Sequence, residues 1–145
     1  MKKYKIGYTQ GVYDMFHIGH LNLLNHAKEY CDFLEVGVNS DDLVSKYKKK
    51  SPVIPENERL EIVQNIKAVD DAFIVNSLDK LQILKEHHYD VIFIGDDWKG
   101  NARWKQTEEA LKPYGIEVLY LPYTHDRTST ALRQESDNKV LDAAE

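Results

Sequence analysis

Short apolar runs alternate with amphipathic segments along almost the whole of this 145-residue chain. Five of the runs are rich in β-branched and aromatic residues and have the length of strands. They cover residues 4–9, 33–39, 72–76, 90–95 and 116–122. Between these runs and after the last, apolar side chains recur every three or four positions, as on one face of a helix. The helical segments cover residues 20–31, 56–69, 78–88, 102–115 and 128–136.

Strands that alternate with helices predict a parallel sheet, because each connection must return to the end of the sheet where strands begin. We therefore predict an α/β fold: a Rossmann-like, five-stranded parallel sheet with helices on both faces. No repeat, low-complexity segment or linker divides the chain, so residues 1–135 are expected to form a single domain. Residues 136–145 are expected to form a polar, loosely held tail.

Composition and charge narrow the class of protein. Hydrophobic residues make up 42% of the chain and charged residues 30%, which is typical of soluble proteins. The net charge of −5 argues against nucleic acid as a partner, and no apolar stretch is long enough to predict a membrane span. The N-terminal segment lacks the apolar core of a secretory signal. Cys31 is the only cysteine and lies in an apolar pattern, so we expect a buried thiol and a cytoplasmic location.

Two histidines lie three positions apart in "YDMFHIGH" (13–20), where the first predicted strand gives way to a helix. Zinc binding is one interpretation, but no second cysteine and no HExxH glutamate offers further ligands. Simple packing is another. Phosphate binding has a physical basis, because a helix N-terminus presents backbone N–H groups and positive partial charge. Gly19 would let a nucleotide approach the backbone, and Asp14 could fix the loop or orient a neighbour. We favour phosphate.

Three more polar segments lie where an open α/β sheet binds its ligands, beyond the carboxyl ends of strands. "KYKKK" (46–50) precedes two prolines and is predicted to be a basic loop, either simply solvated or closing on phosphates. In "GDDWKG" (95–100), Asp96 and Asp97 could bind metal, read a base or form a turn. "RTST" (127–130) offers hydroxyls and backbone N–H groups at the start of the last predicted helix.

The segment "GVYDMFHIGH" (11–20), together with the distant "RTST", resembles the nucleotidyltransferase superfamily that carries the HxGH signature. Class I aminoacyl-tRNA synthetases carry the same four letters, but they are much longer and have a KMSKS loop, which this chain lacks. Within the superfamily, the chain is most similar to glycerol-3-phosphate cytidylyltransferases, from residue 5 to about residue 133. The similarity extends to "NSDD" (39–42), "ENER" (56–59), "VDDAFI" (69–74), "YDVIFIGDDWKG" (89–100) and "LYLPYT" (119–124).

This resemblance implies an enzyme that transfers CMP from CTP to a phosphorylated alcohol. Glycerol 3-phosphate is the first candidate, and the products would be CDP-glycerol and pyrophosphate. Mg²⁺ would accompany CTP and be held mainly by the triphosphate, without a dedicated protein metal site. The relatives are homodimers, so a homodimer is expected. The alternatives are a cytidylyltransferase for phosphocholine, phosphoethanolamine or a polyol phosphate, an adenylyltransferase, and a nucleotide-binding regulatory module without catalysis.

The resemblance also implies roles for single residues. The expected catalytic residues are His17, His20, Lys46 and Arg127, of which the histidines would stabilise the pentavalent α-phosphoryl group. The expected nucleotide ligands are Gly11, Val12, Tyr13, His17, Gly19, His20, Lys50, Asp97, Tyr123, Arg127, Thr128, Ser129 and Thr130. The expected acceptor ligands are Asp14, Lys46, Lys48, Arg59, Lys67, Asp97 and Trp98.

Three of these positions depart from the family pattern. Tyr123 stands where relatives have an arginine, and Arg127 where they have an isoleucine. Lys67 replaces an arginine and so loses the planar fork that binds phosphate through two nitrogens. For Arg59 and Lys67, a simpler interpretation is an exposed helix on which Glu56 and Glu61 are charge partners.

Overall fold

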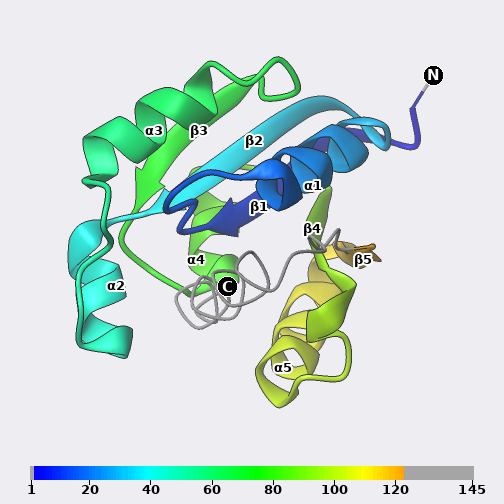
Figure 1. Ribbon diagram of the computed structural model, residues 1–145. Helices are drawn as coiled ribbons and strands as arrows, with labels where there is room; N and C mark the ends of the chain where they lie inside the picture. The colour runs from blue at the N-terminus through cyan, green and yellow to red at the C-terminus, as the bar shows by residue number, and fades with distance from the viewer. Residues whose placement is uncertain (1, 123–145) are drawn as a thin grey trace.

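The computed structural model describes residues 2–122, and these form one parallel sheet with strand order β3-β2-β1-β4-β5 (Figure 1). The strands are β1 (Tyr4–Gly11), β2 (Cys31–Asn39), β3 (Asp71–Val75), β4 (Val91–Gly95) and β5 (Glu117–Leu121). The helices are α1 (Ile18–Lys28), α2 (Asp41–Lys48), α3 (Glu56–Gln64), α4 (Lys80–Glu86) and α5 (Ala102–Leu111). Short 3-10 turns, η1 (Asp96–Trp98) and η2 (Lys112–Tyr114), flank α5. The predicted Rossmann-like fold class is confirmed.

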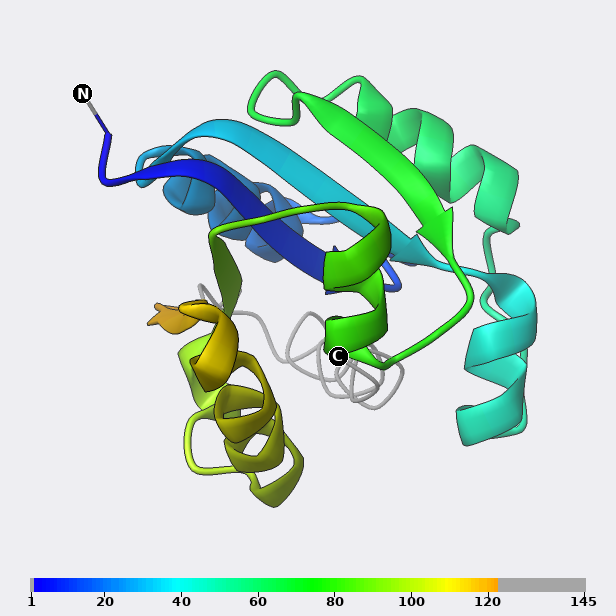
Figure 2. The same cartoon turned by 180° about the vertical axis from the view of Figure 1, so that it is seen from behind.

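Each face of the sheet has its own apolar cluster. On one face, α1 and α3 bury Leu24 and Val63 against β2 and β4 (Figure 1). On the other, α4 and α5 bury Ile83 and Trp104 against β1 and β4 (Figure 2). Cys31 is buried in the first cluster, as predicted, and burial raises the pKa of its thiol. Because helices cover both faces of the sheet, side chains on both sides of a strand are buried. This explains why the strand sequences are nearly continuous apolar runs.

The segment 46–50, predicted to be a loop, is partly helical. Lys46 and Lys48 belong to α2, and the chain leaves the helix only at Lys49, whose φ is 57°. Ser40 begins the helix by accepting a hydrogen bond from the Leu43 amide. Acidic residues in the first turn and lysines in the last turn suit the helix dipole. These signals outweigh the prolines, which follow the helix.

Other boundaries also differ from the prediction. The helix predicted over 56–69 ends at Gln64, and the helix predicted over 20–31 ends at Lys28. The helix predicted over 78–88 begins at Lys80, where Asp79 is the N-cap and accepts the amides of Leu81 and Gln82. The last predicted helix (128–136) and the tail (136–145) lie outside the described residues. Over residues 2–122, no helix combines the length and apolar character that a membrane crossing requires.

The order of the strands reverses between β1 and β4, and this is where an open α/β sheet forms a crevice for ligands. The two strands pair only at Gly7 with Val91 and at Tyr8 with Ile92. Beyond that point the Thr9 hydroxyl, rather than a backbone amide, donates to the Phe93 carbonyl. The main-chain ladder therefore stops before either strand ends, next to the loop that carries the two histidines.

Candidate active site

The histidine pair closes the N-terminus of α1. His17 is the N-cap residue, and its Nδ1 accepts a hydrogen bond from the Gly19 amide over 3.0 Å. In return, the His17 amide donates to Nδ1 of His20 over 3.3 Å. This is a capping box in which two imidazole rings stand where a serine and a glutamate are usual. The three-residue spacing of the histidines therefore serves helix initiation, and their expected chemical role stays a prediction.

The cap fixes which nitrogen of each ring carries the proton. A ring nitrogen that accepts a hydrogen bond cannot also be protonated, so the neutral rings carry their proton on Nε2. The rings stack with centroids 3.9 Å apart and planes 27° from parallel. Tyr13 and Phe16 pack against His20, which is buried. The result is a pair of rigidly held Nε2–H donors at a helix N-terminus.

The loop before the helix has an unusual backbone. Tyr13 and Met15 have φ values of 55° and 48°, a left-handed conformation that costs a non-glycine residue about 1–2 kcal/mol. Asp14, between them, is buried, and its carboxylate accepts hydrogen bonds from the amides of Val53 (2.8 Å) and Ile54 (2.9 Å). Of the two roles considered for Asp14, fixing the loop is the one these contacts provide.

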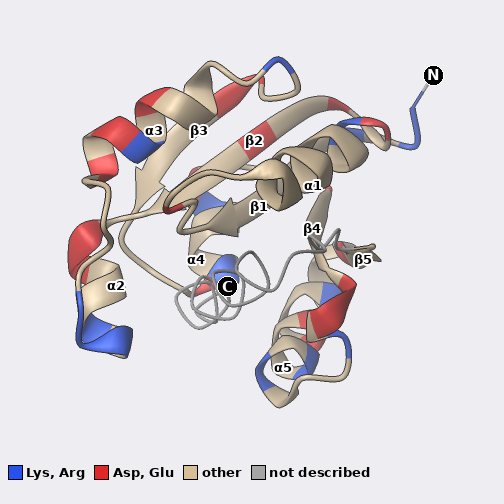
Figure 3. Ribbon diagram, in the orientation of Figure 1, with Lys and Arg blue, Asp and Glu red and all other residues tan. Residues whose placement is uncertain are grey.

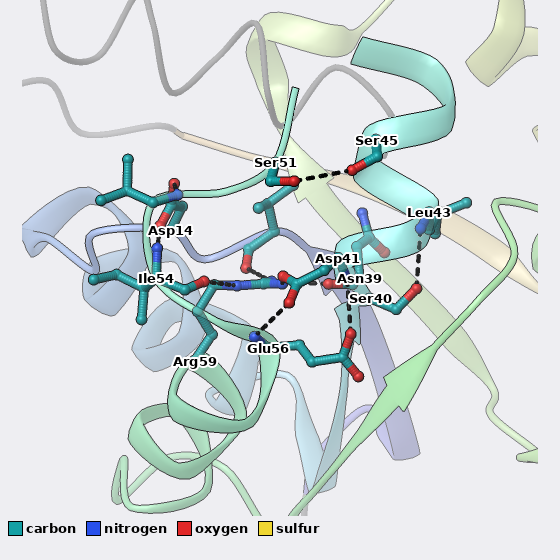
Figure 4. A network of polar contacts seen from close by, with 12 residues as sticks. Asp14, Asn39, Ser40, Asp41, Leu43, Ser45, Ser51, Ile54, Glu56 and Arg59 are labelled. Carbon is teal, nitrogen blue, oxygen red and sulfur yellow. Dashed lines mark hydrogen bonds and ion pairs between the residues drawn. The ribbon is translucent and has the colours of Figure 1, made fainter. Parts of the chain in front are cut away.

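Arg59 has contacts that the sequence did not predict (Figure 4). The side chain is fully buried, and its guanidinium donates to the backbone carbonyls of Val12, Asn39 and Ile54 and to the carboxylate of Asp41. All four bonds are 2.7–2.8 Å long. Neither the exposed helix with Glu56 and Glu61 as partners nor the predicted phosphate contact describes this residue, because its nitrogens are occupied by the protein.

The predicted lysines divide into two groups. Lys46, Lys48 and Lys50 lie on or just after α2, which follows β2 at the edge of the sheet where strands end (Figure 3). This is also the edge at which the histidine loop follows β1. Lys67 lies between α3 and the start of β3, at the opposite edge. The structure does not bring Lys67 together with the histidines.

The "GDDW" segment forms η1 at the end of β4. Asp96 and Asp97 are exposed, and the Lys99 amide closes the turn on the Asp96 carbonyl. Trp98 is half-buried against the apolar cluster under α4 and α5. Within residues 2–122, no group of three or more histidine, cysteine or acidic residues could hold a metal ion. The turn-forming role of this segment is observed, and the expected roles of Asp97 and Trp98 toward substrates stay predictions.

Five predicted site residues cannot be placed. Tyr123, Arg127, Thr128, Ser129 and Thr130 lie outside the described residues.

The sequence interpretation missed a buried polar chain at the ends of β1 and β2. The Tyr8 hydroxyl donates to Oε1 of Gln10, and Nε2 of Gln10 donates to Oδ1 of Asn39, each over 2.7 Å. Nε2 of Gln10 also reaches the Ser77 carbonyl over 3.1 Å. The sequence signal for this polar chain was the presence of polar residues at the ends of otherwise apolar strands. These hydrogen bonds tie the ends of β1 and β2 to the loop that follows β3.

A parallel sheet of this order, with a helix N-terminus beside the point where the strand order reverses, is typical of nucleotide-binding α/β proteins. A family model described as "Cytidylyltransferase-like" matches residues 8–135. The chain belongs to the cytidylyltransferase-like family.

Two kinds of curated relative are similarly close. A glycerol-3-phosphate cytidylyltransferase from Bacillus spizizenii is 34% identical over 128 residues, which is 88% of this chain and 93% of the relative. An FAD synthase from Thermococcus kodakarensis is 35% identical over 127 residues, which is 83% of each chain. Identity alone therefore does not separate the two activities.

Solved structures agree on the fold. The lipopolysaccharide core biosynthesis protein from Thermoplasma volcanium has a TM-score of 0.70 and 27% identity, over 86% of this chain and 99% of that chain. A pantothenate synthetase from Thermus thermophilus has a TM-score of 0.61 at 16% identity, over 87% of this chain and 58% of that chain. The second is evidence for the shared fold alone.

Proposed function

We propose that the protein transfers CMP from CTP to a phosphorylated alcohol, with glycerol 3-phosphate as the first candidate. The observation that carries the proposal is the pair of imidazole rings at the start of α1, held by a capping box in which Nδ1 of each ring accepts a backbone amide. This arrangement leaves Nε2 of each neutral ring as the donor. The relatives named glycerol-3-phosphate cytidylyltransferase, at 34% and 31% identity, support the choice of substrates.

The chemistry is a single in-line displacement. An oxygen of the acceptor's phosphate attacks the α-phosphorus of CTP, and the bond from that phosphorus to the bridging oxygen of the β-phosphate breaks. The electron pair leaves with pyrophosphate. A phosphomonoester is largely dianionic at neutral pH, so the attacking oxygen needs no general base. The enzyme supplies orientation and charge stabilisation.

The protein groups have distinct tasks in this proposal. Nε2–H groups of His17 and His20 donate to the α-phosphoryl oxygens, on which negative charge increases in the transition state. Lys46, Lys48 and Lys50 reduce repulsion between the two anionic substrates. Beyond the described residues, Arg127 and the three hydroxyls that follow it hold the leaving pyrophosphate. Mg²⁺ enters with CTP, held mainly by the triphosphate, and supplies further charge neutralisation.

A second candidate is AMP transfer from ATP to FMN, which gives FAD. It is favoured by relatives named FAD synthase at 35% and 36% identity. A cytidylyltransferase for another phospho-alcohol is a third. The displacement at the α-phosphorus and the role of the histidines are the same in all three. They differ in the nucleoside base and the acceptor.

The experiment is a matrix of pyrophosphate-release assays. CTP and ATP are each combined with glycerol 3-phosphate, phosphocholine, phosphoethanolamine, a polyol phosphate and FMN. The proposal predicts the highest kcat/KM for CTP with glycerol 3-phosphate. Release only with ATP and FMN would replace the proposal by the second candidate. No release from any pair would favour the regulatory module. A homodimer and a cytoplasmic location remain part of the proposal, and the first is tested by light scattering.

A further inference from the structure

The segment 41–56 runs from the first residue of α2 to the first residue of α3, and its two ends lie together. At its first residue, the Asp41 amide donates to the Glu56 carboxylate over 2.8 Å. At its last, the Glu56 amide donates to the Asp41 carboxylate over 3.2 Å. We name residues 41–56 the basic strap. Its two ends are thus joined by a reciprocal pair of hydrogen bonds (Figure 4).

The strap is braced again further out. The hydroxyl oxygens of Ser45 and Ser51 lie 3.3 Å apart, so the two arms of the strap are also joined near its tip (Figure 4). Between these serines the sequence is "KYKKK", which places four lysines in five positions. Without the Asp41–Glu56 and Ser45–Ser51 contacts, repulsion between the lysines and chain entropy would favour many conformations of this segment.

Arg59 lies at the base of the strap and contacts both of its arms. Its Nη2 binds the Asp41 carboxylate over 2.7 Å, and its Nε binds the Ile54 carbonyl over 2.8 Å. The remaining nitrogen, Nη1, reaches out of the strap to the carbonyls of Val12 (2.7 Å) and Asn39 (2.8 Å). Val12 opens the loop that leads to the histidines. One guanidinium therefore connects the strap to the histidine loop and to the end of β2.

A second contact runs in the same direction. The carboxylate of Asp14, in the histidine loop, accepts the amides of Val53 and Ile54, in the returning arm of the strap. The histidine loop is thus tied to the strap region twice. One tie is the carboxylate of Asp14, and the other is the guanidinium of Arg59. A fully buried arginine is costly to desolvate, and here all its bonds go to segments that border the candidate site.

We infer that Arg59 is a positioning residue that fixes the basic strap, and so its lysines, relative to the histidine pair. It does not touch substrate; it acts through the strap. The inference rests on the proposed function, since the lysines need a phosphate-bearing ligand to position against. Lysine cannot replace arginine here, because a single ammonium cannot reach four acceptors spread over a planar fork.

The first test needs no ligand. Amide hydrogen exchange is measured on the wild type and on the variants Arg59→Lys and Leu84→Ala. Leu84 is buried on α4, on the other face of the sheet, so Leu84→Ala serves as a control that is destabilised elsewhere. Arg59→Lys is expected to speed exchange of the Val53 and Ile54 amides by about tenfold or more, with β4 unchanged. Leu84→Ala is expected to speed exchange without that local pattern. An Arg59→Lys profile that matches the control would overturn the inference.

The second test is a mutant cycle on CTP binding, measured by calorimetry. The partner variant carries Lys46, Lys48, Lys49 and Lys50 all changed to Gln. Arg59→Lys is expected to weaken CTP binding by about tenfold in the wild type and by less than about twofold in the partner variant. Equal factors in both backgrounds would mean that Arg59 acts independently of the lysines, and the inference would be wrong.

Two further provisions keep a failure of the inference distinct from a failure of folding or of the proposed function. If Arg59→Lys does not fold, Asp41→Asn is used: it removes the charge of one acceptor of Arg59 and leaves one oxygen for the two donors that the carboxylate now binds. It must show the same local exchange pattern at smaller amplitude. If the wild-type protein binds no CTP, the proposed function fails, while the exchange experiment still decides whether Arg59 holds the strap. An unchanged strap in both Arg59→Lys and Asp41→Asn would overturn the inference on its own.

Discussion

His17 has two tasks within one ring. Its Nδ1 caps α1 through the Gly19 amide, and its Nε2 is the nitrogen proposed to face the α-phosphate. An alanine there would remove both, so a loss of activity after His17→Ala would not distinguish a damaged helix from damaged chemistry. Asparagine separates the tasks, since its Oδ1 occupies nearly the same place as Nδ1 of histidine and is a good N-cap acceptor.

We therefore expect His17→Asn to keep the stability of the wild type and to lose turnover by about 10²-fold or more. His17→Ala should lose turnover similarly and in addition about 1 kcal/mol of stability, the usual value of an N-cap. Urea denaturation and pyrophosphate release measure the two effects. An asparagine variant with near-normal turnover would remove His17 from the proposed mechanism.

Gly37 is required by close packing in the middle of β2. A Cβ built there would lie 2.2 Å from the Tyr8 hydroxyl oxygen. Tyr8 cannot move away, because it is fully buried between the rings of Phe73 and Tyr89. Gly37→Ala is expected to cost about 1–3 kcal/mol and to disturb the bond from Tyr8 to Gln10.

The matched background for this substitution is Tyr8→Phe, which removes the oxygen that the new methyl group would strike. Gly37→Ala should cost less in that background than in the wild type, as measured by urea denaturation of all four proteins. Equal costs would show that the hydroxyl is not the obstacle.

At the scale of elements, β2 carries a carboxylate, Glu35, whose pKa is raised by its surroundings. Burial, and then the negative charge of Asp71 on β3, raise the pKa of Glu35 from 4.5 to about 7, while His88 has a smaller opposing effect. Glu35 and Asp71 are register partners, and Oε2 of Glu35 is buried without a hydrogen bond from any residue in the range 2–122.

This raised pKa predicts the direction of a pH effect. Between about pH 4.5 and 7 the folded state keeps a proton on Glu35 that the unfolded state has released, so stability is lost as pH rises through that window. Glu35→Gln should remove the loss. After allowance for partial solvent exposure, the variant should be more stable than wild type at pH 8 by an amount on the order of 1 kcal/mol.

Near pH 4, Glu35→Gln and wild type should be equally stable. The measurement is thermal or urea unfolding over pH 4–8, with the exposed Glu86→Gln as a control that should follow the wild-type curve. A Glu35→Gln curve that parallels wild type over the whole range would contradict the raised pKa.

Elements were predictable where the signal is local. The five strands and the helices after β1, β3 and β4 follow from apolar periodicity, and the helix expected at the histidine pair begins there. The helix α2 was missed because the prolines that follow it were weighted above its cap and charge pattern. Arg59 was misjudged for a different reason, since its partners come from segments 5 to 47 positions away and no pattern near it identifies them.

At the scale of the whole molecule, the family and fold fix the type of reaction more firmly than the substrates. In the proposed mechanism, the histidines after β1 and the lysines on and just after α2 act on phosphates, which CTP and ATP share. The same proposal leaves the choice of base and acceptor to other groups. The proposal agrees with the similar identity of this chain to relatives that are named for two different activities, 34% and 35%.

The most direct test of the central claim follows the oxygen atoms. Wild-type protein is supplied with CTP, Mg²⁺ and glycerol 3-phosphate in which the three non-bridging phosphate oxygens are ¹⁸O, and the products are analysed by mass spectrometry. Attack by the acceptor on the α-phosphorus predicts CDP-glycerol that retains all three labels, together with unlabelled pyrophosphate. Label in pyrophosphate, or no CDP-glycerol from this pair of substrates, would contradict the account.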